Sequence, residues 1–469
     1  MLPMVKSPEI VAHYAHWFES VFSQAGFIEF QRYLAGILAS ENKTVEGINR
    51  MCVFERRNQS SLNRWLTASP FSEAMLNQQR LALLESLPGT QMKPKGVLSI
   101  DDTLLTHYGS HFADIAILLD PVTRSYTWAH DLVNLYYSDD QSDYPVAWQL
   151  WKPADLETLE TGLPAAGVKL RESKFALKET DPRKWRQYIL GVWSRNQDKP
   201  GVAELYQSKL HIARELLRTW VAEHPNMNLP VTFDSWYTQP AFCRYLTKDL
   251  HLRYVGALNE DDRLTLKRGE MTLKEFADQL KAEHLKAVKE GGQLVFRKIG
   301  IRYKGTKESY YSYCHHHLIH NLGKQRLVIN FSKSDLSDTP KLLISNCLTW
   351  QSEGITRIYR HRWPVEVYHE EGKAEGLDQY QVRNLQAISR HISLVAVAFS
   401  LLRAIPHDRV LLRKLQRELE MDLEGSAAYW RRVTNAESLW ALALFISVRL
   451  TQGQSLHELM KPLLAAVCG

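Results

Sequence analysis

Apolar residues recur at helical spacing through the first ninety residues of the chain. The pattern predicts two helices over Val11–Phe22 and Phe27–Leu38, followed by two shorter ones over Val45–Met51 and Asn58–Leu66. Two short helices around a tight turn resemble a helix-turn-helix, whose second helix enters a DNA groove. We therefore predict a helical DNA-binding domain over residues 1–90. The alternative is a small helical bundle with polar faces.

The second short helix carries polar side chains that suit contact with DNA. It presents Gln59, Asn63 and Arg64, which can reach base edges or phosphates. Arg64 is therefore a candidate DNA-binding residue.

After Leu87-Pro88-Gly89 the pattern changes to short apolar runs that are typical of strands. Two of these runs end in aspartates: Gly96–Ile100 is followed by Asp101 and Asp102, and Leu229–Phe233 is followed by Asp234. Further strands are predicted over Trp128–Tyr137 and Val146–Trp151, and helices over Leu205–Val221 and Gln239–Leu250. Strands followed by helix–strand alternation indicate a mixed α/β core.

The second half of the chain is first rich in strand patterns and then helical. Strand patterns extend from Tyr254 to Asn346, with one helix predicted over Glu275–Leu285. The apolar stretch Asn384–Ala404 predicts a long buried helix. The tail Arg409–Cys468 also reads as helical, with Trp430 and Trp440 as expected packing anchors.

The composition is that of an ordinary globular protein, with 45% hydrophobic and 23% charged residues. A chain of 469 residues is too long for one core, so we expect roughly three domains. The longest apolar run, Ser393–Leu402, is shorter than the about 20 residues that span a bilayer. The N-terminus has no signal pattern, so we predict a cytoplasmic location. The five cysteines are scattered, which argues against disulfides and against a thiolate zinc site.

Basic residues gather between Lys286 and Lys307, where seven residues are Lys or Arg and only Glu290 is acidic. A basic strip interleaved with aromatic residues fits a path for a phosphate backbone. The alternative is a solvated edge strand whose lysines prevent aggregation. The candidate DNA contacts in this strip are Arg297, Lys298, Arg302 and Lys304.

Four residues near the end of the strand-rich region fall at helical spacing: Tyr359, Arg362, Glu366 and Lys373. One carboxylate between an arginine and a lysine suits a divalent metal beside phosphates. The alternative is a solvated helix with alternating charges. Pro364 interrupts the pattern, so that either the helix kinks or a new helix begins with Pro364 in its first turn.

Together, Asp102, Asp234 and Glu366 form a candidate metal site, because two aspartates at strand ends and a glutamate on a helix can converge on a pair of Mg²⁺ ions. Two such ions can activate a water or a 3′-hydroxyl and stabilise the leaving oxygen. Asp101 competes with Asp102 as the first ligand, because strand alternation sends neighbouring side chains to opposite faces.

A cluster of histidines after Cys314 offers a second, weaker metal candidate. It comprises His315, His316, His317 and His320, but no second ligand pair with known spacing accompanies it. A polar or DNA-facing strand is the favoured interpretation.

These residues resemble a known family. The signature Tyr359, Arg362, Glu366 and Lys373 matches that of the insertion-sequence-four superfamily of bacterial cut-and-paste DDE transposases. The segments SIDDTLL and WAHDLVNLYY resemble the first catalytic block of that superfamily, and VTFDSWY resembles the second. The segment LDQYQVRN is also similar to the family.

The resemblance implies a ribonuclease-H-like mixed-sheet core with a β-rich insertion, flanked by helical regions. Asp102, Asp234 and Glu366 would be the catalytic metal ligands, with two Mg²⁺ ions that Mn²⁺ can replace. Tyr359, Arg362 and Lys373 would bind phosphates near the cleaved end. The expected core spans residues 91–250 and 349–405, the insertion 251–348, and the helical C-terminal region 406–469.

The implied function is transposition: binding terminal inverted repeats, cutting by metal-dependent hydrolysis, and joining the 3′-hydroxyl ends to target DNA. The implied partners are double-stranded DNA and a second copy of the chain in a synaptic homodimer, at the nucleoid. Two alternatives are a catalytically inactive DNA-binding regulator and a stand-alone nuclease. The related enzymes use an aromatic residue in the insertion to stack on a flipped base, and the match fails here because no tryptophan lies between Trp236 and Trp350.

Overall fold

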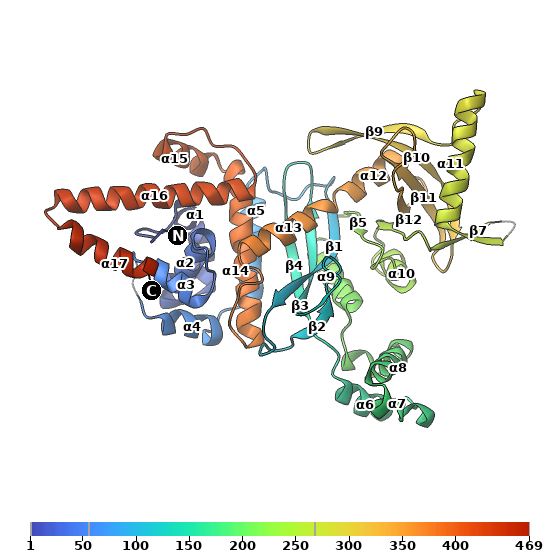
Figure 1. Ribbon diagram of the computed structural model, residues 1–469, viewed down its shortest axis with the longest axis horizontal. Helices are drawn as coiled ribbons and strands as arrows, with labels where there is room; N and C mark the ends of the chain where they lie inside the picture. Colours follow the sequence, from blue (N-terminus) through green and yellow to red (C-terminus); the bar gives the residue numbers. More distant parts are fainter. Residues whose placement is uncertain (1, 55–56, 267–268, 469) are drawn as a thin grey trace.

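A computed structural model describes residues 2–54, 57–266 and 269–468 of the chain. A mixed sheet of twelve strands, within this described part, runs through the middle of the molecule, and helices gather at one side (Figure 1). The structure is therefore mixed α/β, as the sequence predicts.

The first strands form the core of this sheet. They are β1 (Val97–His107), β2 (Ala116–Leu119), β3 (Tyr126–Ser138), β4 (Asp143–Trp151), β5 (Val231–Phe233) and β6 (Tyr254–Ala257). Strands β1, β3 and β4 form an antiparallel meander, whereas β5 and β6 lie parallel to β1 in the order β3-β1-β5-β6. This arrangement agrees with the expected ribonuclease-H-like core.

Strand β1 is longer than the sequence indicated. It pairs with β3 through His107, so Asp101 and Asp102 lie inside the strand and not at its end. The expected end at Ile100 was wrong, because the buried Thr103 and Leu105 continue the strand alternation beyond the two aspartates.

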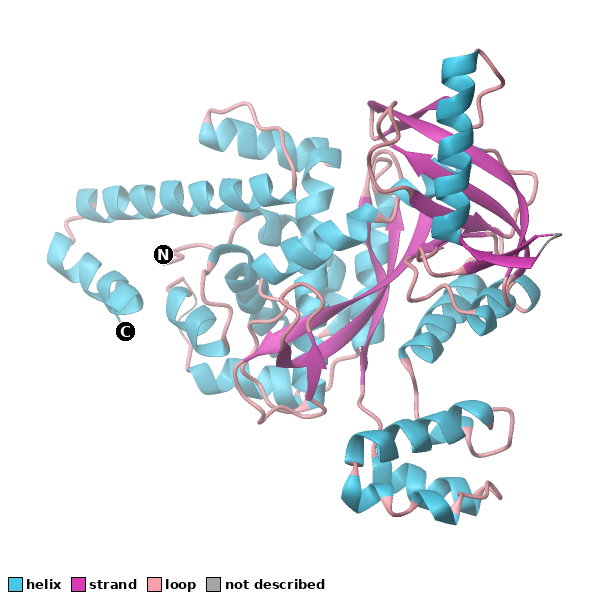
Figure 2. Ribbon diagram, turned by 45° about the vertical axis from the view of Figure 1, so that its right-hand side comes forward, coloured by secondary structure: helices cyan, strands magenta, loops and turns pink. Residues whose placement is uncertain are grey.

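The strand-rich segment after β6 extends the same sheet. It contains β7 (Arg263–Leu266), β8 (Gly269–Thr272), α11 (Leu273–Glu290), β9 (Arg297–Tyr303), β10 (Thr306–Ile319), β11 (Gly323–Phe331) and β12 (Lys341–Ser345). Because β12 pairs with both β6 and β11, these strands continue the core sheet without a break (Figure 2). The predicted strands and the helix between them are confirmed.

A group of helices between β4 and β5 has a hydrophobic core of its own, which the sequence analysis did not predict. It comprises α6 (Leu156–Ala165), α7 (Leu177–Thr180) and α8 (Pro182–Arg195), packed around Trp185 and Trp193. In Figure 2 these helices lie below the sheet, joined to it by loops. The helices that follow, α9 (Lys209–Glu223) and α10 (Pro240–Lys248), match the predicted ones.

The N-terminal region is helical as predicted. It contains α1 (Glu9–Tyr14), a 3-10 helix (Ala15–Val21), α2 (Gln24–Ala39), α3 (Val45–Met51), α4 (Gln59–Ala68) and α5 (Glu73–Ser86). The side chain of Thr44 accepts a hydrogen bond from Gly47 N and caps α3, and Asn58 caps α4 in the same way.

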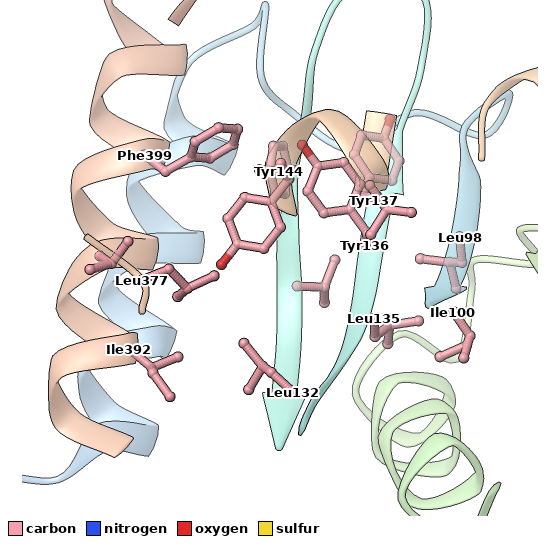
Figure 3. Packing of buried hydrophobic residues seen from close by; sticks show 14 of the residues in the cluster. Leu98, Ile100, Leu132, Leu135, Tyr136, Tyr137, Tyr144, Leu377, Ile392 and Phe399 are labelled. Atoms are coloured by element: carbon pink, nitrogen blue, oxygen red, sulfur yellow. The ribbon is translucent and has the colours of Figure 1, made fainter. Parts of the chain in front are cut away.

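The remaining helices are α12 (Ser352–Arg360), α13 (Trp363–Ala374), α14 (Leu385–Ala404), α15 (Arg409–Leu419), α16 (Ala427–Thr451) and α17 (Leu456–Cys468). Helix α14 is buried along most of its length between the N-terminal helices and the sheet. Figure 3 shows Phe399 and Ile392 of α14 facing Tyr136 and Leu132 of β3. Helix α14 thus joins the helical layer to the sheet.

Buried arginines reinforce the contact between α14 and its neighbours. Arg390 donates to the carbonyl oxygens of Leu66 and Ser69, at the C-terminal end of α4. Arg80 of α5 donates to Ser400 of α14 and to the Pro145 carbonyl of β4. Because each guanidinium satisfies several buried acceptors, the helical layer is held in one position on the sheet.

The two tryptophans expected to anchor the C-terminal helices behave differently. Trp430 is buried, whereas Trp440 is 53% exposed, so its predicted packing role was wrong. Within the described residues, two helical segments are long and apolar enough to cross a membrane by length and composition. They are Leu385–His407, whose most apolar window is 83% buried in the protein, and Ala428–Thr451, whose window is 22% buried. All five cysteines are unpaired, as expected.

The central position of α14 can be tested with a matched pair of leucines. Leu394→Ala removes a fully buried side chain and is expected to lower the free energy of unfolding by about 2–5 kcal/mol. Leu439→Ala on α16 removes a side chain that is 54% exposed, so we expect a change within about 0.5 kcal/mol. Urea unfolding followed by tryptophan fluorescence measures both, and equal losses would contradict the central position of α14.

Candidate active site

Two aspartates meet at the point where β1 and β5 run side by side. The parallel register pairs Ser99 with Thr232 and Ile100 with Phe233. Continuing this register by one residue sets Asp101 beside Asp234, with both side chains on the same face of the sheet. A parallel pair of strands thus brings together two carboxylates that are far apart in the sequence.

The Asp234 side chain is held by the turn that follows β5. Its Oδ1 atom accepts hydrogen bonds from the backbone N–H groups of Trp236 (3.0 Å) and Tyr237 (3.2 Å). Burial raises the pKa of Asp234, and these two hydrogen bonds oppose that shift. The short turn therefore fixes one carboxylate oxygen of Asp234.

The signature residues are carried by two helices and the junction between them. Helix α12 ends at Arg360, and α13 begins at Trp363 with Pro364 in its first turn. The second of the two predicted arrangements, a new helix at Pro364, is therefore confirmed. Tyr359 belongs to α12, while Glu366 lies in the first turn of α13, where the helix dipole favours a carboxylate.

Arg362, at this junction, binds two of the carboxylates. It donates to Asp101 Oδ2 at 2.9 Å and also to Glu366 Oε1. Its guanidinium carbon lies 5.5 Å from the centre of the Tyr359 ring, and only 12% of its side chain is exposed. One buried cation therefore connects the first strand to the signature helix.

The three carboxylates of Asp101, Asp234 and Glu366 outnumber the one cation, Arg362. Burial, opposed by Arg362 and assisted by the charges of Asp234 and Asp102, raises the pKa of Asp101 to about 8. The site thus carries excess negative charge in a poorly solvated position. Perturbed carboxyl groups of this kind are common at functional sites.

Asp102 points away from this group, onto the opposite face of β1. Its Oδ2 atom binds Lys209 Nζ at 2.9 Å, and its Oδ1 atom accepts a hydrogen bond from the Tyr237 hydroxyl at 2.7 Å. Of the two candidates for the first ligand, the structure therefore brings Asp101, and not the predicted Asp102, to Arg362 and Glu366. Asn134, opposite Asp101, faces the same helix through His369, which supports this orientation.

Lys209 is a residue that sequence reasoning missed. Its Nζ atom bridges Asp102 and the buried Asp131 of β3 (3.0 Å) and lies 4.5 Å from the centre of the Trp236 ring. The turn that holds Asp234 therefore contacts α9 through Trp236 and β1 through Tyr237. No local pattern could reveal this contact, because Lys209 is distant from both strands in the sequence.

The predicted DNA contacts lie in different places. Arg297, Lys298 and Arg302 are exposed on β9, and Arg64 is exposed on α4. Lys373 lies in the last turn of α13 and is partly buried. Lys304 instead forms an ion pair with the buried Asp143, because the turn between β9 and β10 rests against the start of β4.

The environment of Tyr359 differs between its hydroxyl group and its ring. Its hydroxyl oxygen is buried and has no hydrogen-bond partner within the described residues. Lys341 Nζ lies 5.1 Å from the centre of its ring, on β12. A phenol that is free to donate, beside two cations, suits contact with a phosphate oxygen.

Asp101, Asp234 and Glu366 supply the hard oxygen ligands that Mg²⁺ prefers. Among the residues that the structure describes, no group of three or more His, Cys, Asp or Glu side chains is already arranged as a metal site, and this includes the histidines after Cys314. Arg362 lies between Asp101 and Glu366, where it acts as their counter-ion. The excess negative charge and the oxygen donors fit a divalent cation.

The chain was also compared with known proteins. A family model described as DDE superfamily endonuclease matches residues 18–272, which is more than half of the chain. The match includes Asp101, Asp102 and Asp234 and ends before the signature helices. No curated protein matches the chain.

The raised pKa of Asp101 predicts a dependence of stability on pH. Because the pKa rises from 3.8 to about 8 on folding, Asp101 contributes stability below about pH 4 that is lost as the pH rises toward 8. Asp101→Asn has no carboxyl group at this position, so the variant does not lose this stability as the pH rises. In EDTA we therefore expect the variant to melt at a higher temperature than the wild type at pH 8, with a smaller difference at pH 5.

Asp335 provides a comparison, because its pKa is shifted in the opposite direction. The Ser337 side chain and backbone lower the pKa of this exposed carboxyl, so Asp335→Asn should lose stability at neutral pH and not gain it. Melting temperatures across pH 4–9 measure both variants. A melting temperature of Asp101→Asn that stays at or below the wild-type value at pH 8 would contradict the buried, charge-crowded position of Asp101.

Proposed function

The chain belongs to the family of DDE superfamily endonucleases, and on this premise we propose that it is a DNA transposase of the insertion-sequence-four type. It binds the terminal inverted repeats of its own element, cuts the DNA, and joins the 3′-hydroxyl ends to target DNA. A cytoplasmic location at the nucleoid goes with this function. The observation that supports the proposal is that Arg362 binds both Asp101 and Glu366, while Asp234 directly follows the strand β5 that pairs with β1.

Asp101, Asp234 and Glu366 would hold the metal, with two Mg²⁺ ions as the favoured occupancy and Mn²⁺ as a substitute. When bound, the ions supply an activated water or 3′-hydroxyl and stabilise the leaving oxygen. The protein fixes the ligands beforehand: the sheet register holds Asp101, the turn after β5 holds Asp234, and the first turn of α13 holds Glu366. Such positioning suits a reaction without a covalent protein nucleophile.

Arg362 has two roles in this proposal. Without bound cations it neutralises Asp101 and Glu366. With cations held by the carboxylates, the guanidinium would be available to a phosphate of the DNA, which it can bind through two donors. Tyr359, on one side of Arg362, and Lys373, further along α13, would bind neighbouring phosphates.

Cleavage of a duplex that carries the native end sequence tests the catalytic assignment. We expect each of three substitutions to lower Mg²⁺-dependent cutting by more than about a hundredfold: Asp101→Asn, Asp234→Asn and Glu366→Gln. A loss of about a hundredfold is the most that is typical of residues that only support metal ligands, so a larger loss indicates a ligand. Asp102→Asn is the matched control and should lose less. Gel assays of labelled DNA, with and without EDTA, measure the rates.

A larger loss in Asp102→Asn than in Asp101→Asn would reverse the assignment of the first ligand. Cutting that survives all four substitutions would overturn the proposed site. Selective binding without any cutting would indicate the inactive regulator, and cutting without joining to target DNA would indicate a stand-alone nuclease. A second labelled duplex, supplied as target, reveals joining and so separates a stand-alone nuclease from a transposase.

We also propose that the protein forms a homodimer through α16. Trp440, Leu444 and Val448 are spaced four residues apart on this helix and are 53%, 54% and 43% exposed. Figure 1 shows α16 extending away from the sheet, followed by α17, which turns back. An exposed apolar stripe on a long helix is typical of a helix-helix interface.

Light scattering coupled to size exclusion tests the dimer. Trp440→Glu combined with Leu444→Glu places two charges in the stripe, so we expect the mass to fall from that of a dimer to that of a monomer. Val288→Glu on α11 is the control, because Val288 is also exposed (58%) but lies outside the stripe. If the double variant keeps the dimer mass, the interface lies elsewhere.

A further inference from the structure

Two adjoining cavities connect α4 with the end of β1. The larger one, about 720 Å³, lies against residues 106–112 and the segment after α13. The smaller one, about 460 Å³, lies between α4 and the same segment. Both are lined by Thr44, Gln381 and Arg383, so they form one continuous depression, which we call the α4 groove.

One wall of the α4 groove is the polar face of α4. Gln59, Asn63 and Thr67 line it at intervals of four residues, which places them in a row along the helix. Gln59 and Asn63 are exposed. Their carboxamides can donate and accept at once, which is the pattern that reads an adenine edge.

The other wall is an extended segment that connects α13 to α14. Its residues alternate: Gln379, Gln381 and Arg383 are exposed, whereas Tyr380 and Val382 are buried. The segment is held firmly, because the Tyr380 hydroxyl bonds His130 Nδ1 at 2.6 Å. The backbone oxygen of Arg383 also accepts a hydrogen bond from Ala113 N at 2.9 Å. Its polar side chains therefore face the groove from a rigid backbone.

The far end of the groove, beside β1, is formed by aromatic rings and the imidazole of His107. His107 lies between Phe112 and Tyr380, with ring centroids 4.4 Å and 4.5 Å away. Its Nε2 atom is buried and has no hydrogen-bond partner within the described residues. Burial lowers the pKa of His107 to about 4, so the imidazole is neutral and can donate or accept at this nitrogen.

We propose that the α4 groove is the surface that recognises the end sequence of the element. Gln59, Asn63 and Gln381 contact base edges, and Arg383, in the middle of the groove, binds a phosphate of the same duplex. This inference rests on the proposed transposase function and adds the residues that determine which DNA is bound. It assigns sequence reading to two segments that are more than three hundred residues apart in the chain.

The partner that this surface fits is duplex DNA, for two reasons. Gln59 and Asn63 of the row along α4 are exposed, so a DNA strand that lies along the depression can reach their amides. The residues that line the two cavities supply amides and one guanidinium beside two carboxylates, Glu46 and Asp378. A groove of amides around one cation suits recognition of bases beside a phosphate backbone.

Fluorescence anisotropy with two duplexes tests the groove. One duplex carries the native end sequence and the other has the same composition in shuffled order. Asn63→Ala and Gln381→Ala are each expected to reduce the preference for the native end by roughly 5- to 150-fold, as expected for the loss of a base contact. Gln454→Ala, at an exposed position between α16 and α17, is the matched control and should keep the preference.

Arg383→Ala should act differently from the amide variants. We expect it to weaken binding to both duplexes alike and to reduce the slope of log affinity against log salt by about one, because it removes a phosphate contact. Arg409→Ala, at an exposed position on α15, is its control. Melting temperatures equal to that of the wild type establish that each variant is folded.

The outcomes separate this inference from the proposed function. If the wild type prefers and cuts the native end while Asn63→Ala and Gln381→Ala keep the preference within twofold, the α4 groove is overturned and the transposase assignment stands. If the wild type prefers the native end through these residues but never cuts it, the groove is supported and the transposase assignment fails. A wild type without any preference overturns both.

Discussion

The candidate site depends on the neutralisation of carboxylates on both faces of β1. Arg362 bridges two of them on one face, including Asp101, and Lys209 bridges two on the other face, including Asp102. Each cation comes from a helix on its own side of the sheet. Removing either cation would leave paired carboxylates in a poorly solvated position, which is costly. The two ion clusters therefore fix the position of β1 between α9 and α13.

This balance of charge links the stability of the site to its function. A carboxylate whose pKa is raised by burial and by like charges disfavours the folded chain at neutral pH. In the proposed function, a divalent cation would relieve that repulsion more fully than one guanidinium does, so binding of metal would tighten the site. It would also leave Arg362 available to a phosphate. The counter-ion of the carboxylates and the proposed phosphate-binding group would then be the same side chain.

The sequence predicted the parts of this arrangement that depend on local pattern. The signature spacing located Arg362 and Glu366, and the short apolar runs located the aspartates. It could not choose between Asp101 and Asp102, because the choice depends on the register between β1 and β5, which are separated by more than a hundred residues. Local alternation alone gives two faces and does not say which one meets α13.

The other differences have the same origin in distant contacts. Trp440 has the spacing of a core residue, but its helix extends beyond the body of the protein and leaves the ring exposed. Lys304 belongs to a basic strip, yet its ammonium group is bound by Asp143 of a distant strand. The helices between β4 and β5 enclose a small core of their own, and their short segments give no long periodic signal.

The path of the chain explains how recognition and cutting can act together. Helix α13 carries Glu366, and the extended segment that follows it carries Arg383 before the chain enters α14. That segment is bound at Tyr380 and at Arg383 to β3 and to the loop after β1, so it cannot shift independently of the strands. Helix α14, in turn, contacts α4 and is tied to its C-terminal end through Arg390. A duplex held by α4 and Arg383 would therefore be positioned by the same rigid elements that hold Asp101 and Glu366. Selective binding would thus set which phosphate reaches the carboxylates.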